Sequence, residues 1–337
     1  MMMELNILSH EPEILQYSSG LIQIKIPLDN PLRWVNSYVL QHGRELAVID
    51  PGPRTARAER EWELVLQKLG MQVQEITSIV LTHHHPDHYG LAGFFQELSG
   101  AAVWMSERAH QEAKLMWGKH SSMSADLPAF FRIHGMPAAW LEQLPGHLDS
   151  FLPQVKPAPQ ARFLRDGDVV PLGGRLWQAV QTHGHAPGHL SFWHAESGDL
   201  ICGDAVLPQI SPNVSLLPGS DAQPLHSFLE GLRRLRELPV RTAYPGHRNP
   251  FTHYRERIDA LLAHHEERLD TAADLLQTAG PQSAFEVCTA LFGGRLGIHQ
   301  MRFAMCEALA HLAELSRRSR AVPREHPDGW ISFAVPE

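Results

Sequence analysis

The sequence predicts an α/β fold in which two groups of short strands build a layered sandwich. Two observations support this prediction. Short apolar segments alternate with amphipathic helical segments over most of the chain, and several of the apolar segments end in a histidine or aspartate next to a small residue. Small residues let the backbone approach a neighbouring group closely. The recurrence therefore indicates that separate strands bring polar side chains to similar positions.

The first group of elements lies before residue 106. Strands are expected at 21–26, 37–41, 45–50, 79–82 and 101–105. Residues 56–69 predict a helix, because Trp62 and Val65 belong to an apolar stripe at helical spacing, and Gly70 ends it. A second helix is expected at 89–98.

The second group follows residue 160. Its expected strands lie at 168–172, 175–181, 190–194 and 200–202. Residues 224–237 predict a helix, because apolar side chains recur on one face. Together the two groups describe the two halves of a sandwich.

The stretch from His83 to His88 is the most informative part of the chain. It reads His-His-His-Pro-Asp-His directly after a buried strand and holds metal-capable side chains at alternating positions. Imidazole and carboxylate suit zinc, iron or manganese. His83 and His85 are predicted to bind one ion, and Asp87 and His88 a second. His84 is expected to lie behind the ligands or face solvent.

Further ligands are expected where later strands end. The candidates are the Gly-His of residues 184–185, the Gly-Asp of residues 203–204 and the Gly-His of residues 246–247. His183 and His189 flank the first of these motifs, so three histidines compete for one position. Of the three, only His185 directly follows the glycine of the motif. His189 is expected to orient the loop or a ligand.

The order of these motifs resembles the metallo-β-lactamase superfamily, particularly its glyoxalase II-like hydrolases, over about residues 20–250. The resemblance implies a four-layer αβ/βα sandwich with a dinuclear site at one edge. The implied ligands of the first ion are His83, His85 and His185. The implied ligands of the second are Asp87, His88 and His247, with Asp204 bridging both ions.

Residues 106–160 and 207–214 lie outside the basic sandwich pattern. The first segment is rich in Met, Trp and Phe, which predicts either a helical lid over an apolar pocket or simple packing onto the body. The second follows Asp204 and is expected to form a wall of the site or a rigid connector. Asn213 within it is a candidate contact to substrate or to a ligand. Cys202 is expected to be a buried strand residue rather than a ligand.

The sequence divides into a catalytic domain at 1–252 and a C-terminal domain at 253–337. The second domain is expected to contain three helices, with Ser283 and Glu286 forming a capping box, and then a hairpin. This pattern resembles the winged-helix appendage of some superfamily members. From residue 256 to the end there are eight Lys and Arg against twelve Asp and Glu, whereas a DNA-reading wing should be basic. We therefore expect a role in packing, homodimer formation or closing the substrate cleft.

The composition limits the partners. A net charge of −8 disfavours nonspecific binding to nucleic acid or anionic membrane, and 43% hydrophobic content is typical of a globular protein. Residues 1–6 lack the pattern of an export signal, and no apolar run is long enough to cross a bilayer. The three cysteines are widely spaced, which favours a cytoplasmic location without disulfides. We expect a small-molecule substrate.

These features predict a dinuclear metal-dependent hydrolase. Two divalent ions, with zinc first and iron or manganese as alternatives, would deprotonate a bridging water near neutral pH. This hydroxide would attack a thioester, lactone or other ester, and Asp87 would accept or relay a proton. The first alternative is a ribonuclease or phosphodiesterase, because phosphoryl chemistry uses the same hydroxide. The second is an iron-dependent redox or dioxygenase enzyme.

Overall fold

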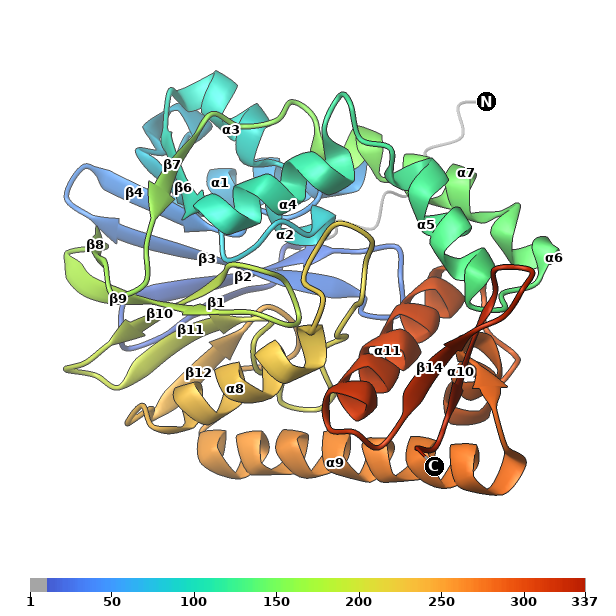
Figure 1. Ribbon diagram of the computed structural model, residues 1–337. Helices are drawn as coiled ribbons and strands as arrows, with labels where there is room; N and C mark the ends of the chain where they lie inside the picture. Colours follow the sequence, from blue (N-terminus) through green and yellow to red (C-terminus); the bar gives the residue numbers. More distant parts are fainter. Residues whose placement is uncertain (1–10, 337) are drawn as a thin grey trace, which may run out of the picture.

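The computed structural model describes residues 11–336 and contains two facing sheets, with helices on their outer sides and a third, smaller sheet near the C-terminus (Figure 1). The expectation that residues 1–6 form no export signal lies outside the described residues. The helix–sheet–sheet–helix arrangement confirms the predicted α/β sandwich.

The first sheet has seven strands in sequence order. They are β1 (Ile14–Gln16), β2 (Leu21–Pro27), β3 (Trp34–His42), β4 (Glu45–Ile49), β5 (Ser78–Val80), β6 (Ala102–Ser106) and β7 (Ala161–Leu164). Neighbours from β1 to β4 are antiparallel, and those from β4 to β7 are parallel. The sequence analysis did not identify β1 or β7, because both are short and partly exposed.

The second sheet has five strands in the order β12-β11-β10-β9-β8. Its strands are β8 (Val169–Leu172), β9 (Arg175–Thr182), β10 (His189–His194), β11 (Asp199–Gly203) and β12 (Thr242–Pro245). The pair β11–β12 is parallel and the other pairs are antiparallel. Helix α8 (Pro224–Arg236) packs on β9 with its apolar side chains inward.

Helices α1 (Ala56–Leu69), α2 (Pro86–Tyr89) and α3 (Ala92–Ser99) belong to the first half, with the short helix η1 (Val73–Glu75) between α1 and β5. The structure confirms α1, which Thr55 caps by accepting a hydrogen bond from the Ala58 N–H and which Gly70 ends in the left-handed conformation. The helix expected at 89–98 is present as α3, but its predicted start was wrong. Residue 89 is instead the last residue of the separate short helix α2, which has Pro86 at its first helical position. A break separates α2 from α3.

The insert is helical, as predicted. It contains α4 (Glu107–Trp117), α5 (Met123–Ile133), α6 (Ala138–Leu141), α7 (Leu144–Asp149) and η2 (Leu152–Val155). Phe131 is fully buried and Trp117 is 9% exposed, and both belong to the main apolar core. These two side chains pack the insert onto the body, which favours the packing interpretation over a freely moving lid.

The C-terminal part contains α9 (Tyr254–Ala279), β13 (Gln282–Ser283), α10 (Ala284–Phe292), α11 (Ile298–Arg317), β14 (Val322–Glu325) and β15 (Ile331–Ala334). The predicted helices, hairpin and Ser283–Glu286 capping box are all present. Helix α11 is packed against α7, α8 and α9, so it connects the insert to the sandwich (Figure 1). Among residues 11–336, no helix has the length and apolar character that crossing a membrane requires.

Candidate metal centre

Four loops that follow strands converge at one edge of the two sheets. The loop after β5 supplies His83, His85, Asp87 and His88, and the loop between β9 and β10 supplies His185. Asp204 follows β11 directly, and His247 follows β12 closely. All seven residues predicted as ligands therefore lie together, although they are scattered along the sequence.

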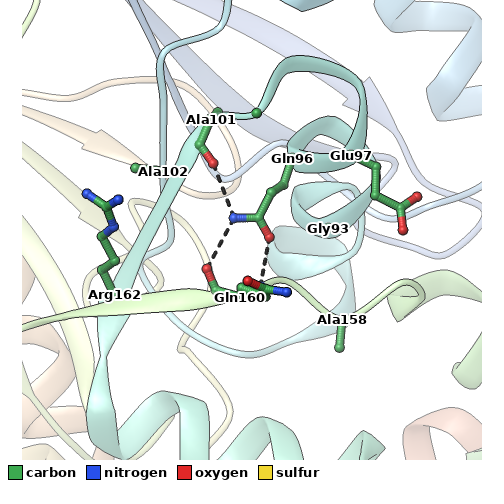
Figure 2. A pocket seen from close by; sticks show the side chains of 9 residues that line it. Gly93, Gln96, Glu97, Ala101, Ala102, Ala158, Gln160 and Arg162 are labelled. Carbon is green, nitrogen blue, oxygen red and sulfur yellow. Dashed lines mark hydrogen bonds between the residues drawn. The ribbon is translucent and has the colours of Figure 1, made fainter.

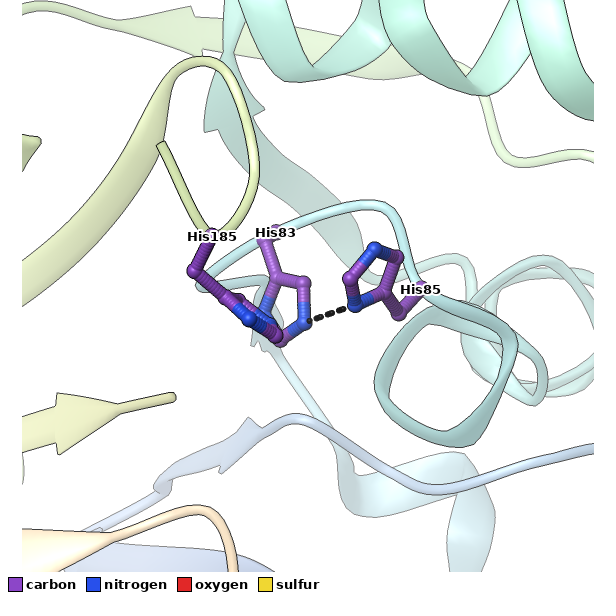
Figure 3. A group of neighbouring side chains, drawn as sticks. All are labelled: His83, His85 and His185. Atoms are coloured by element: carbon purple, nitrogen blue, oxygen red, sulfur yellow. Dashed lines mark hydrogen bonds between the residues drawn. The ribbon is translucent and has the colours of Figure 1, made fainter. Parts of the chain in front are cut away.

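The first group consists of His83, His85 and His185, whose rings point toward one another (Figure 3). The His83 Nε2 atom lies 3.0 Å from His85 Nδ1. The ring centroids of His85 and His185 are 4.7 Å apart. One nitrogen from each ring lies within 4.8 Å of the others, so the three rings could share one ion.

The second group consists of Asp87, His88 and His247, and it meets the same distance criterion. The Asp87 Oδ2 atom lies 3.3 Å from His247 Nε2 and 3.9 Å from His88 Nε2. The Asp87 side chain is 22% exposed, whereas His88 and His247 are almost completely buried. Solvent therefore reaches this group from the Asp87 side.

Asp204 lies between the two groups. Its Oδ2 atom is 3.6 Å from His185 Nε2, 3.5 Å from His88 Nε2 and 3.4 Å from His247 Nε2. A carboxylate at this position contacts ligands of both predicted ions, as the bridging role requires.

Hydrogen bonds on the far side of the rings fix their orientation. Nδ1 of His88 faces Asp50 Oδ2 at 2.9 Å. Nδ1 of His185 faces the Asn213 carbonyl at 2.8 Å. Nδ1 of His247 faces the Trp34 carbonyl at 2.9 Å. A proton held on Nδ1 leaves the Nε2 lone pair free for a metal ion.

Four of the atoms that face the centre have no hydrogen-bond partners among the described residues. These buried atoms are Nε2 of His88, His185 and His247 and Oδ1 of Asp204. Buried polar atoms without partners are costly, so a group of them facing one point indicates a missing partner. Imidazole and carboxylate donors fit divalent zinc, iron or manganese. The residues thus fit a dinuclear metal centre.

The pKa values of the histidines shift in opposite directions in the two ligand groups. Burial, together with the neighbouring imidazoles, lowers the pKa of His83 and His85 well below the usual value. Burial also opposes charge on His247, but the Asp204 carboxylate and then Asp87 outweigh it and raise the pKa of His247 to about 10. The first group is therefore neutral at pH 7, whereas without metal the second group holds protons that a metal ion must displace.

Asp50 is the functional residue that sequence reasoning missed, although a strand was expected to end at it. Its Oδ1 atom accepts a hydrogen bond from the Thr82 N–H at 2.8 Å, and its Oδ2 atom accepts one from the Thr82 hydroxyl at 2.6 Å and contacts His88. The Thr82 hydroxyl in turn lies 2.9 Å from His83 Nδ1. Asp50 directly follows β4, so the strand-end pattern used for the predicted ligands also applied to it.

Gly246 allows the strand ends to meet. A Cβ atom at this position would lie 2.2 Å from Asp204 Oδ1 and 2.6 Å from His88 Cε1. Both distances are far below van der Waals contact, so any side chain here would displace ligands of the centre.

The remaining candidates have structural partners. His189 Nε2 accepts a hydrogen bond from the Asp204 N–H at 3.1 Å, so it supports the Asp204 backbone. His183 is half-buried and accepts a hydrogen bond from the Gly188 N–H, which stabilises the turn before β10. His84 is buried rather than solvent-facing, and its carbonyl accepts a hydrogen bond from the Trp117 indole of the insert. Cys202 is buried and donates to the Val206 carbonyl.

Asn213 lies beside the centre through its main chain. Its carbonyl faces His185, whereas its side-chain Nδ2 donates to Glu307 Oε2 at 2.8 Å and to the Phe303 carbonyl at 3.3 Å. The amide therefore faces α11. Glu307 is also held by Arg268, at 2.6 Å. The C-terminal part thus supports the loop that orients His185.

A separate pocket of about 410 Å³ lies between α3 and the start of β6 (Figure 2). Its Gln96 side chain is fully used in hydrogen bonds to the main chain of Ala101 and Gln160. The start of β6 is at the opposite end of the parallel strands from the metal-binding loops. Ligands of such sheets bind at the carboxyl ends of the strands, so this pocket carries no part of the proposed chemistry.

Comparison with known proteins identifies the same family that the order of the sequence motifs resembles. A family profile described as Metallo-beta-lactamase superfamily matches residues 32–247, and one described as Metallo-beta-lactamase-like, C-terminal domain matches residues 260–336. A crystal structure of a metallo-beta-lactamase family protein from Thermus thermophilus is 35% identical with a TM-score of 0.83, covering 94% of this chain and 99% of that chain.

Two curated relatives are more distant. The probable metallo-hydrolase YqjP of Bacillus subtilis (strain 168) is 27% identical over 306 residues, which is 88% of this chain and 92% of that protein. An atrochrysone carboxyl ACP thioesterase of Aspergillus fumigatus is 26% identical over 221 residues, or 64% of this chain and about half (51%) of that protein.

Proposed function

Because this chain belongs to the metallo-β-lactamase superfamily and is a metallo-hydrolase of that fold, we propose that it hydrolyses small carbonyl substrates, thioesters first, at a centre of two divalent ions. One observation carries the proposal. Asp204 lies between the two ligand groups, and the buried Nε2 atoms of His88, His185 and His247 near it lack hydrogen-bond partners. The thioesterase among the relatives favours thioesters within the carbonyl class.

The ligand residues and their neighbours define the roles in this mechanism. His83, His85 and His185 would hold one ion, Asp87, His88 and His247 would hold the other, and Asp204 would contact both. Two bound divalent ions supply Lewis acidity and activate water near neutral pH. Zinc is our first choice, with iron and manganese as alternatives.

The protein's own groups handle the proton. Asp87 is the partly exposed carboxylate of the centre, and His88 and His247 hold its pKa below the usual value even though burial opposes this. The carboxylate is therefore ionised at pH 7, and one of its oxygens could accept a proton from the attacking water. In thioester hydrolysis water adds its oxygen to the acyl carbon, the C–S bond breaks, and a proton passes to the thiolate. The products are a carboxylic acid and a thiol.

The test combines metal analysis with a substrate panel. We expect about two metal ions per chain and turnover of at least one thioester, with lactones, β-lactams, phosphodiesters and single-stranded RNA assayed beside it. Asp204→Asn should lower metal content below one ion per chain and reduce kcat/KM by at least about 100-fold. Asp274→Asn, an exposed carboxylate on α9, is the matched control and should change neither.

Each outcome has a clear meaning. Cleavage of RNA or phosphodiesters without any ester or thioester turnover would replace the carbonyl proposal with phosphoryl chemistry. Bound iron with oxygen-consuming activity would replace it with redox chemistry. Full metal content and activity in Asp204→Asn would refute the assigned centre itself.

A further inference from the structure

Helix α11 carries a buried arginine that has no ionic or hydrogen-bonding partner among residues 11–336. Arg302 is 7% exposed, and its buried Nε atom lacks an acceptor. Its contacts are aromatic: the guanidinium carbon lies 4.1 Å from the Phe303 ring centroid and 5.6 Å from that of Phe151. Aromatic faces stabilise a cation, but they leave the in-plane N–H donors of the guanidinium unused.

An unpaired charge is costly to bury, so a structural role alone is a poor explanation for Arg302. Other buried charges on α11 have partners. Glu307 is held by Arg268 and Asn213, and Glu314 by Arg317 and Arg318. Burial lowers the pKa of Arg302, and the nearby Cys306 thiol opposes this shift without neutralising the charge. An anion would complete the surroundings of this guanidinium, whose Nε atom is buried without an acceptor.

Two chains of contacts place Arg302 next to the metal-binding loops. On one side, the carbonyl of its neighbour Phe303 accepts a hydrogen bond from Asn213, whose own carbonyl faces His185. On the other side, the Phe151 ring lies 6.0 Å from that of Trp117, which donates to the His84 carbonyl at 3.2 Å. Arg302 is thus linked through its neighbours to the His185 loop and to the insert, and its helix α11 contacts α7 of the insert (Figure 1).

Two histidines complete the surroundings. The His299 ring centroid lies 5.0 Å from that of Phe303 and 5.4 Å from that of His147. Burial, followed by the Arg302 charge, lowers the pKa of His147 to about 4, and the same two causes lower the pKa of His299. Both rings are neutral at pH 7 and can donate a hydrogen bond without adding charge. The set resembles a receptor for one small anionic group.

We propose that Arg302 binds an anionic group of the substrate, a carboxylate or a phosphate, while the scissile carbonyl lies at the metal centre. This proposal rests on the hydrolase function proposed above and narrows it to acidic thioesters and esters. The anion belongs either to the acyl half of the substrate or to the leaving thiol, and the two sources can be separated by experiment. Guanidinium forms paired hydrogen bonds with both kinds of anion.

The kinetic arm uses matched thioesters with the metal-loaded full chain. Succinyl, glutaryl and adipyl thioesters of N-acetylcysteamine are compared with the same compounds ending in carboxamide. A second pair of thioesters shares one neutral acyl group and differs in the leaving thiol, which is phosphopantetheine in the anionic member and pantetheine in the neutral member. We expect a preference of about 10- to 100-fold in kcat/KM for the anionic member of one pair, and the responding pair identifies the half that carries the charge.

Substitutions then assign the preference to Arg302. Arg302→Met retains an apolar stem of similar length and should abolish the preference while changing kcat/KM for the neutral member less than about threefold. Arg302→Lys retains the charge and should preserve part of the preference. The matched control is Arg317→Met on the same helix, because its side chain is 40% exposed and pairs with Glu314. It should leave the preference intact.

The binding arm does not depend on turnover. In calorimetric titrations, glutarate and glutaramate both offer one carboxylate to the metals, but only glutarate offers a second. We expect the wild type to bind glutarate about tenfold more tightly, and Arg302→Met to bind both equally. If the wild type shows no anionic preference in either arm, the Arg302 proposal is wrong and the hydrolase proposal stands. A glutarate preference that needs Arg302, without any ester or thioester turnover, would support the anion site and refute the hydrolase.

Discussion

Asp50→Asn should weaken metal binding although Asp50 belongs to neither predicted ligand group. Asparagine has the same size as aspartate and tolerates the positive φ of 50° at this position. The substitution replaces one carboxylate oxygen by an NH2 donor. If the remaining oxygen stays on the Thr82 N–H, the new donor faces His88 Nδ1.

The consequence for His88 follows from its tautomer. Facing a donor, Nδ1 becomes the acceptor, and the ring proton moves to Nε2, the atom that faces the metal centre. Losing the partner that orients a metal-bound histidine typically costs about 10- to 100-fold in metal affinity. That range corresponds to about 1.4–2.7 kcal/mol. The binding free energy should fall by this amount at the second ion, which His88 helps to hold.

Metal affinity is measured by competition with a chromophoric chelator, together with metal content after dialysis. Asp199→Asn is the matched control, because Asp199 is also a buried carboxylate but lies at the start of β11, at the end of that strand away from Asp204. It should lower the melting temperature without changing the metal affinity. If Asp50→Asn folds and binds both ions within about twofold of the wild type, the tautomer argument is refuted.

The remaining predictions concern pH and packing. Affinity for the second ion should rise with pH, by about tenfold per unit for each proton displaced, and should level off near the His247 pKa of about 10. Chelator competition at pH 6, 7 and 8 measures this, and a flat profile would contradict the assigned protonation. Gly246→Ala should reduce metal content below one ion per chain while circular dichroism stays native, because its Cβ would overlap Asp204. Gly146→Ala is its control, since nothing lies within 4 Å of that Cβ, and equal metal content in both variants would argue against the close approach.

Local patterns in the sequence predicted much of the fold. Helix α1 has its stripe, its cap and its final glycine within 16 consecutive residues, from Thr55 to Gly70, so no distant contact is needed to recognise it. The Ser283–Glu286 capping box is equally local. Strands β1 and β7 were missed because they have little apolar alternation of their own and are defined by pairing with β2 and β6.

The candidate ligands were visible because each follows a strand and has a distinctive residue type. The same sequence carried no sign that the Asn213 main chain, rather than its amide, faces the centre, since the side chain contacts α11 about 90 residues further along the chain. Arg302 was equally hidden, because in the helical pattern an arginine is expected at the surface.

The sequence alone determined which residues have the chemistry to bind metal and which segments form helices and strands, because periodicity, caps and ligand types are encoded within a few neighbouring positions. Only the tertiary structure decided how those residues are supported. Asp50 behind His88, α11 behind Asn213 and the unpaired guanidinium of Arg302 arise from contacts between distant segments. Such contacts depend on how the elements pack, and packing leaves no short repeating signal in the chain.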